Sequence, residues 1–331
     1  MKYIFNINKD LNFLEFIRSI LKFEKTNGFL FSCNTYFHSI IGDLSEEEKI
    51  VLNYFGNKFF TDDYIIVHNI KIKSGLSFLW NIYSDNSKIL ELENTIEWKN
   101  MKEKMYSKFE NIWSIEYPKL IKWKEILEIY NHNNIIDIVL KVNNFFDVDN
   151  VNEININLFI NGDKNFSAGY ANPISENVFN LFLSNVEIKN TENVLCNIIH
   201  ETVHVLNNKS ELYKSLYKKL YNKRKNDILR FKNINWRVLA LPEVIAYNVS
   251  SVNYPSKSYI GRKIFNSIKS KEFVDDQSIR RDNFAYRYIE VSFLCLEKTI
   301  KYLENDKKMD INYLEFVFDN WIEYLNKLNA R

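Results

Sequence analysis

The sequence predicts a helix-rich α+β fold with a small mixed sheet, and three observations support this class. Only seven glycines and four prolines occur in 331 residues, which favours long uninterrupted elements. Strand-like alternation of apolar and polar residues is concentrated between residues 150 and 190. Helical spacing of apolar residues dominates on both sides of that region. We therefore expect a mixed, mainly helical N-terminal region at 1–145. A second domain is expected at 146–331, in which the sheet precedes a helical C-terminal part.

The N-terminal region is expected to be mostly helical. Its predicted strands are 3–7, 64–72 and 76–83, and its predicted helices are 11–23, 91–130 and 134–146. Ser45, followed by three glutamates, forms a capping box that begins a further helix. Pro118 is expected to break the long helix in which it lies. Three tryptophans of this region are interpreted as core residues: Trp98, Trp113 and Trp123.

The second domain begins with strands and continues with helices. The predicted strands are 154–160 and 177–183, with a glycine-containing edge segment at 167–170 between them. Alternating asparagines in the first strand predict that it is half-buried. The predicted helices after residue 209 are 210–231, 242–252, 282–304 and 310–328. The last of them carries an apolar stripe that we interpret as core: Leu314, Val317, Trp321, Leu325 and Leu328.

Charge, cysteine content and hydropathy exclude several classes of protein. With 44 basic and 42 acidic residues, the chain has no electrostatic footprint for nucleic acid. Cys33, Cys196 and Cys295 are an odd and widely spaced set, which predicts a reducing compartment rather than a disulfide framework. No signal peptide and no membrane-spanning segment are recognisable. We expect a cytoplasmic protein. Export by a route that needs no signal peptide is left open, and the sequence specifies no oligomeric state.

Residues 200–204 carry the most specific chemical pattern of the chain. They read His-Glu-Thr-Val-His, which is the H-E-x-x-H signature of zinc hydrolases. On a helix, His200 and His204 lie on one face and can bind one Zn²⁺ ion. Glu201 lies about 100° round the helix from His200, where it can reach a water on the metal without ligating it. The pattern therefore predicts two metal ligands and a general base.

The surrounding residues predict that this helix is buried. Thr191 is expected to cap its N-terminus, with Glu192 in the first turn. Asn207 and Asn208 are expected to end it, because asparagine tolerates the left-handed conformation. Between these limits runs a broad apolar surface: Val194, Leu195, Ile198, Ile199, Val203 and Leu206.

A third protein ligand is expected downstream, because catalytic zinc takes three protein ligands and keeps one position open. Glu243 is the preferred candidate. Pro242 suits the first position of a helix, which would place Glu243 in the first turn. Ala246 is small enough to let that helix pack closely against the motif helix. Rival ligands are Glu211, Asp227 and, for a purely structural site, Cys196.

These residues resemble the zincin metallopeptidases of gluzincin type. The resemblance rests on H-E-x-x-H at 200–204, on Glu243 and Ala246 as an E-x-x-A stretch, and on a strand, edge segment and strand before the motif helix. It implies a zincin-like catalytic domain with Zn²⁺ held by His200, His204 and Glu243. Gly169 and Tyr170 would line an edge strand that pairs with an extended substrate.

Other branches of the zincins fit less well. The metzincin pattern would need glycine and histidine where Asn207 and Ser210 stand, and the thermolysin spacing would need an acid near Arg224. The acid that commonly follows the alanine in gluzincins is replaced by Tyr247. The gap between His204 and Glu243 is long, at 38 residues (205–242), as in clostridial neurotoxin light chains. The E-E-F-x-x-F-G-G stretch of those toxins is absent.

The resemblance implies a zinc-dependent peptidase acting on a peptide or protein substrate. Glu201 would pass a proton from the metal-bound water to the leaving amine. A further group would stabilise the oxyanion, with Tyr247 and Tyr288 as the chosen candidates beside Tyr286 and Arg287. Two alternatives remain open: a catalytically inactive, zinc-binding zincin-like scaffold or interaction protein, and a regulatory or host-directed protease with a single protein target.

Overall fold

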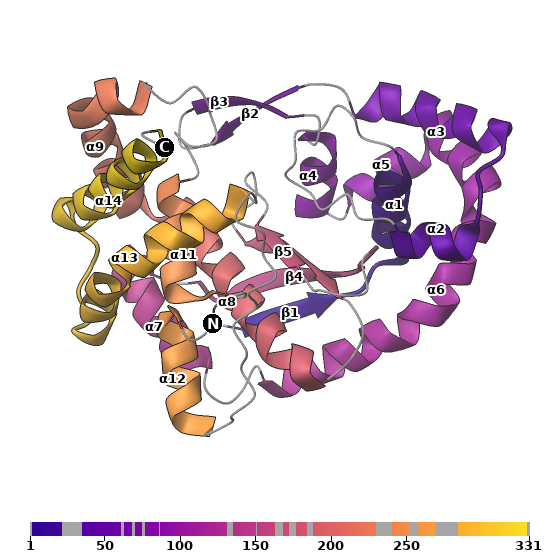
Figure 1. Cartoon of the computed structure of the whole chain (residues 1–331). Helices are drawn as coiled ribbons and strands as arrows, with labels where there is room; N and C mark the ends of the chain where they lie inside the picture. Colours follow the sequence, from indigo (N-terminus) through magenta and orange to yellow (C-terminus); the bar gives the residue numbers. More distant parts are fainter. Residues whose placement is uncertain are drawn as a thin grey trace. The chain divides into compact units, whose positions relative to one another are not determined.

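The computed structural model forms two compact units, each built from separate stretches of the chain (Figure 1). It describes residues 2–21, 35–60, 63–67, 70–74, 77–85, 87–130, 135–149, 151–162, 168–171, 177–183, 188–229, 240–251, 254, 257–268 and 284–329. Unit 1 comprises residues 1–2, 130–152 and 188–331, and unit 2 comprises 3–129 and 153–187. The units therefore cut across the expected boundary at residue 145, because residues 153–187 belong to unit 2 together with residues 3–129.

Unit 2 contains the sheet and the N-terminal helices. Its strands are β1 (Lys2–Asn6), β2 (Asp63–Val67), β3 (Ile70–Ser74), β4 (Glu153–Ile160), β5 (Ala168–Ala171) and β6 (Val178–Leu183). Its helices are α1 (Lys9–Ile20), α2 (Thr35–Ile41), α3 (Glu46–Phe59), α4 (Ser77–Ser84), α5 (Lys88–Glu93) and α6 (Ile96–Tyr130). The predicted capping box at Ser45 is confirmed: its hydroxyl accepts from the Glu48 N–H, and the Glu48 carboxylate accepts from the Ser45 N–H. The three predicted core tryptophans are all buried.

A mixed sheet with the order β1-β4-β6-β5 lies in unit 2. β4 and β6 are parallel, whereas β5 pairs antiparallel with β6 and forms one edge. The expectation that β4 is half-buried is wrong, since every side chain from Ile156 to Ile160 is buried. Asn157 is only 3% exposed because its amide donates to Asn180 and to the Tyr83 carbonyl, which satisfies its polar group inside the sheet.

Three expectations about the N-terminal elements are wrong. Residues 77–84 form helix α4 rather than a strand, because a short apolar run fits both structures and Leu79, Ile82 and Tyr83 gather on one helical face. Residues 64–72 belong to two strands, β2 and β3, which pair antiparallel. Helix α6 runs through Pro118 without ending. Buried side chains on both sides of Pro118, including Trp113 and Trp123, stabilise the helix despite a proline cost of about 3 kcal/mol.

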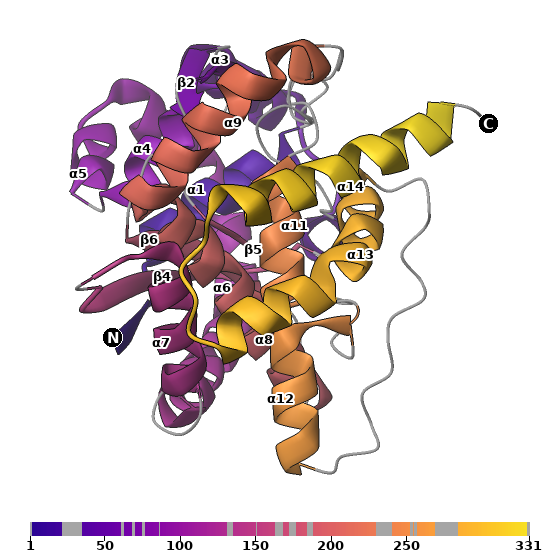
Figure 2. The same ribbon diagram turned by 90° about the vertical axis from the view of Figure 1, so that its left-hand side faces the viewer.

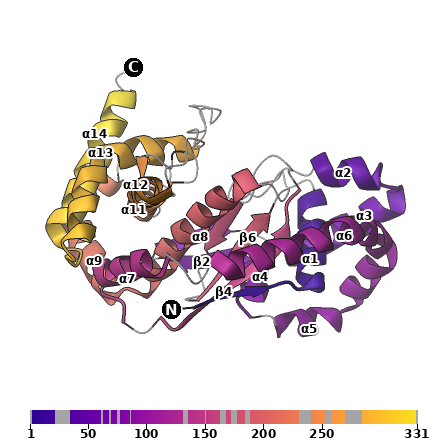
Figure 3. The same ribbon diagram turned by 90° about the horizontal axis from the view of Figure 1, so that it is seen from below.

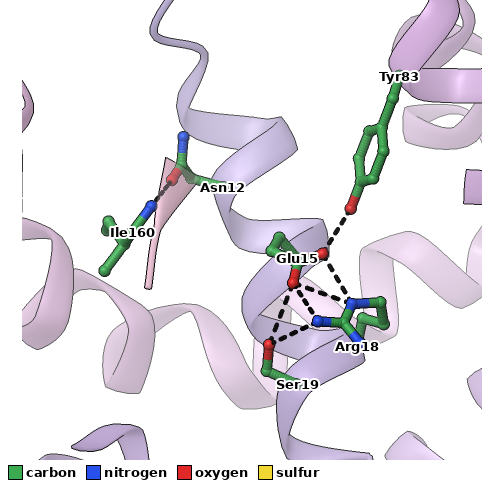
Figure 4. Close-up of polar contacts among 6 residues, drawn as sticks. All are labelled: Asn12, Glu15, Arg18, Ser19, Tyr83 and Ile160. Atoms are coloured by element: carbon green, nitrogen blue, oxygen red, sulfur yellow. Dashed lines mark hydrogen bonds and ion pairs between the residues drawn. The ribbon is translucent and has the colours of Figure 1, made fainter. Parts of the chain in front are cut away.

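Two polar residues of α1 anchor it within unit 2 (Figure 4). Asn12 accepts from the Ile160 N–H at 2.9 Å and donates to the Leu158 carbonyl, so it satisfies backbone groups at the end of β4. Glu15 is 2% exposed and forms a buried ion pair with Arg18, whose Nε lies 2.8 Å from Oε2. The Tyr83 hydroxyl donates to the same carboxylate at 2.8 Å. Each charged group therefore has hydrogen-bonding partners in the interior.

Removing the Tyr83 hydroxyl should destabilise unit 2 measurably. Tyr83→Phe deletes a hydrogen bond to a buried carboxylate, and we expect the free energy of unfolding to fall by about 1.5–3 kcal/mol. Tyr54→Phe is the matched control, because Tyr54 is 59% exposed on α3. Urea unfolding of both variants measures the difference. Equal stabilities of the two variants would show that the hydrogen bond from Tyr83 to Glu15 contributes little.

Unit 1 is built from helices, seen together in Figures 2 and 3. They are α7 (Ile135–Phe146), α8 (Ile188–Lys209), α9 (Glu211–Leu229), α11 (Ala240–Val249), α12 (Tyr259–Ile268), α13 (Phe284–Glu304) and α14 (Ile311–Asn329). α11 packs against α8, α13 and α14. The predicted core stripe of α14 is buried at Leu314, Val317, Trp321 and Leu325, whereas the side chain of Leu328 lies outside the described residues. The sequence did not predict α12.

None of the helices in the described ranges is both long enough and apolar enough to span a membrane. Cys196 and Cys295 are buried free thiols, and Cys33 lies outside the described residues.

Candidate metal centre

Helix α8 carries the two histidines of the motif on a buried surface. The six apolar residues predicted to surround them are all buried, and His200 is itself only 6% exposed. Both predicted limits of this helix are wrong. It begins at Ile188, so that Thr191 lies inside it, and it continues through Asn207 and Asn208 to Lys209. The helix ends where the next one starts, because the Ser210 hydroxyl accepts from the Tyr213 N–H and begins α9.

Helix α11 brings Glu243 to the two histidines. As predicted, Glu243 lies in the first turn, although α11 begins at Ala240 and Pro242 is its third residue. A proline is tolerated there because the first N–H groups of a helix have no intrahelical partner. Ala246, one turn after Glu243, is fully buried, and α11 packs directly against α8.

Three side chains from these two helices form a compact donor cluster. The Nε2 atoms of His200 and His204 lie 3.3 Å apart. Nε2 of His200 lies 3.6 Å from Oε2 of Glu243, and Nε2 of His204 lies 3.6 Å from the other carboxylate oxygen, Oε1. Tetrahedral zinc with ligands at about 2.0–2.2 Å holds its donors roughly 3.3–3.6 Å apart. The two imidazole nitrogens have the spacing of two such donors, and one ligand atom from each of the three residues lies within 4.8 Å of the others. Within the described ranges, this is the one group of histidine, cysteine and acidic side chains close enough to share a metal ion.

The rival ligands have other surroundings. The Glu211 side chain is 85% exposed and pairs with Lys214 at 2.7 Å. Asp227 pairs with Arg224 at the same distance. The Cys196 thiol is buried one turn before His200, and it is not part of the donor cluster.

The charge state of the cluster suits a cation. Burial by itself would raise the pKa of Glu243, but the adjacent imidazoles of His204 and His200 lower it by more, so its pKa lies well below the usual range. Glu243 is therefore ionised at neutral pH. Glu201 is 5% exposed beside this cluster, and its negative charge contributes to raising the pKa of Tyr247.

Two tyrosines that the sequence suggested as oxyanion donors lie near the cluster. The Tyr247 ring packs on His200 with the ring centroids 4.6 Å apart. Tyr288 of α13 is buried and stacks on Trp321 at 5.3 Å. Burial and, secondarily, the charge of Glu243 raise the pKa of both phenols well above the ordinary value. Each therefore remains protonated at neutral pH and can donate a hydrogen bond.

One contact of the cluster, between His200 and Ser250, was not predicted from the sequence. The Nδ1 atom of His200 lies 3.0 Å from the carbonyl oxygen of Ser250, the residue that follows α11. The Ser250 hydroxyl donates to the Cys196 carbonyl at 2.7 Å. No residue type identifies such a partner, because every residue has a carbonyl oxygen.

The other suggested site residues lie as follows. Gly169 and Tyr170 belong to the edge strand β5 of unit 2. Arg287 is partly buried in α13, and the side chain of Tyr286 lies outside the described residues. Comparison with protein-family models, with curated proteins and with solved structures gave no significant match.

Proposed function

We propose that this protein is a zinc-dependent metallopeptidase of gluzincin type. In this proposal His200, His204 and Glu243 hold Zn²⁺, and Glu201 is the general base for hydrolysis of a peptide bond. The observation that carries it is the clustering of these three side chains, whose ligand atoms all lie within 4.8 Å of one another. A zincin-like fold, with the small mixed sheet preceding the motif helix, is part of the same proposal.

We infer zinc rather than iron from the acid that lies beside the cluster. Two histidines and one carboxylate also bind non-haem Fe²⁺, but there they occupy one face of an octahedron. A base beside the cluster, Glu201, also fits hydrolysis.

The proposed mechanism divides the work among the residues of this chain. Bound zinc would supply Lewis-acid chemistry, lowering the pKa of a coordinated water and polarising the scissile carbonyl. Glu201 accepts the proton of the attacking water and later delivers it to the leaving amine. Glu243 stays ionised, and its negative charge would offset part of the positive charge of the cation. Tyr247 and Tyr288, both protonated, are proposed as donors to the developing oxyanion.

Single tyrosine variants assign the oxyanion donor. If one phenol stabilises the oxyanion, its replacement by phenylalanine should lower kcat by about 10²–10³-fold with little change in KM. Tyr247→Phe and Tyr288→Phe each retain the ring and its packing on His200 or Trp321. Steady-state kinetics of both variants provides the measurement. Unchanged kcat in both would exclude these two residues from the role.

Cleavage of unfolded proteins and of a short-peptide library tests the proposed activity. We expect hydrolysis of at least one of these substrates, its loss on chelation, and its return when zinc is added back. Hydrolysis of unfolded protein and peptides alike would indicate a general peptidase. Zinc binding without hydrolysis of any substrate would contradict the proposed activity and favour a scaffold that only binds the metal.

A further inference from the structure

Ser250 contacts the motif helix at two points and has no exposed surface. Its carbonyl oxygen lies 3.0 Å from Nδ1 of His200, and its hydroxyl donates to the Cys196 carbonyl at 2.7 Å. We infer that Ser250 is a positioning residue that fixes the tautomer and the orientation of the His200 ring for metal binding. The inference rests on the proposed zinc site.

The contact with the carbonyl determines which nitrogen of His200 is free. A carbonyl oxygen only accepts hydrogen bonds, so Nδ1 must carry the hydrogen. In the neutral ring the lone pair is then on Nε2. That atom lies 3.3 Å from Nε2 of His204 and 3.6 Å from the Glu243 carboxylate. Ser250 therefore directs the metal-binding nitrogen of His200 into the donor cluster.

Helix α11 explains why this carbonyl is available. The Ser250 N–H donates to the Ala246 carbonyl at 2.8 Å, so Ser250 continues the helical pattern just beyond Val249. The last carbonyls of a helix accept no hydrogen bond from the same helix, so they can accept one from another group. They also form the negative end of the helix dipole. Glu243 lies seven residues earlier, about 10 Å along the same helix. Residues at the two ends of α11 thus contact the two ring nitrogens of His200: Glu243 lies near Nε2 and Ser250 near Nδ1.

The hydroxyl of Ser250 connects this carbonyl to the turn that carries His200. Cys196 lies four residues before His200 in α8, so its carbonyl is the expected acceptor for the His200 N–H. The Ser250 hydroxyl binds the same carbonyl. Ser250 therefore contacts both the ring of His200 and the carbonyl that is the expected acceptor for the His200 N–H. Tyr247 stands where related enzymes carry an orienting acid, and its ring packs on His200 while Ser250 supplies the acceptor.

The tautomer of His200 in the zinc-free protein tests the inference independently of metal binding. Long-range ¹H–¹⁵N correlation spectra of histidine-labelled protein, recorded above the ordinary pKa of histidine, report which ring nitrogen carries the hydrogen. The His200 signals are assigned by their loss in His200→Gln. We expect the Nδ1–H form to predominate and its hydrogen to exchange slowly. Predominance of the Nε2–H form would overturn the inference.

Zinc affinity of Ser250→Ala tests the contribution of the hydroxyl. We expect the Kd for zinc to rise about 10- to 100-fold, as for other groups that orient metal ligands. Ser292→Ala is the matched control: Ser292 is also fully buried in unit 1 and donates its hydroxyl to a backbone carbonyl, that of Ile289, at 2.6 Å. Circular dichroism establishes that both variants are folded, and the control should bind zinc within about twofold of the unmodified protein.

The outcomes separate this inference from the proposed function. If the unmodified protein binds zinc and Ser250→Ala binds it equally well, the hydroxyl has no positioning role and the zinc site stands, while the tautomer of His200 decides the role of the carbonyl. An equal loss of affinity in Ser292→Ala would also overturn the role of the hydroxyl, because any buried serine would then have the same effect. If the unmodified protein binds no zinc, the proposed function is contradicted. The tautomer of His200 then still decides whether Ser250 orients the ring.

Discussion

Glu201→Gln is expected to lower kcat for peptide hydrolysis by about 10²–10⁴-fold while zinc remains bound. Glutamine has nearly the same shape as glutamate, but its amide cannot accept the proton of the attacking water. Glu201 is buried beside His200 and is not one of the three clustered donors, so its replacement should leave them in place. Initial rates on the best substrate, together with the zinc content of the same sample, measure both parts of the expectation.

Glu211→Gln is the control for this variant. It makes the same chemical change on the exposed surface of α9, and we expect it to leave both activity and zinc content unchanged. Full activity of Glu201→Gln would remove the proposed general base. Loss of zinc together with activity would instead assign Glu201 to metal binding or to the packing of α8.

The second large effect is expected for the third ligand. Structural zinc sites with four ligands have apparent binding free energies of about 10–16 kcal/mol, or roughly 3 kcal/mol for each ligand. Glu243→Gln keeps the size of the side chain but replaces the anionic ligand with a neutral amide. We therefore expect the Kd for zinc to rise on the order of 10²-fold, with a corresponding loss of activity at limiting zinc. Competition with a chromophoric chelator measures the Kd.

Rival ligands provide the comparison for Glu243. Glu211→Gln and Asp227→Asn alter acids that pair with Lys214 and Arg224, and zinc affinity should be unchanged in both. If Glu243→Gln retains full affinity while one of these variants loses it, the ligand assignment is wrong. The lowered pKa of Glu243 also predicts that its carboxylate stays ionised down to mildly acidic pH.

The site could be predicted from sequence because its residues lie on helices with regular spacing. His200 and His204 share a face of α8 by periodicity alone. Glu243 was identified by its place near the start of a helix, and the structure brings it to both histidines. Ser250 could not be predicted, since its contact with His200 uses a backbone carbonyl and depends on tertiary packing.

The fold was predicted less completely than the site, for physical reasons visible in single elements. Residues 77–84 form a short apolar segment that suits a strand or a buried helix equally, and packing made it α4. Pro118 disfavours a helix locally, but the buried residues around it stabilise α6 across the whole of Ile96–Tyr130. The asparagines of β4 suggested an exposed face, whereas the Asn157 amide donates to Asn180 Oδ1 and to the Tyr83 carbonyl inside the sheet. Tertiary interactions decided each of these cases.

Zinc content of the purified protein, with and without His204→Ala, tests the proposed site most directly. After zinc supplementation and removal of free metal, elemental analysis should find about one zinc ion per chain in the unmodified protein. His204→Ala removes one of the three clustered donors, and its zinc content should fall close to zero under the same conditions. A zinc content near zero in the unmodified protein, or an equal content in both, would contradict the assignment of His200, His204 and Glu243 as a metal centre.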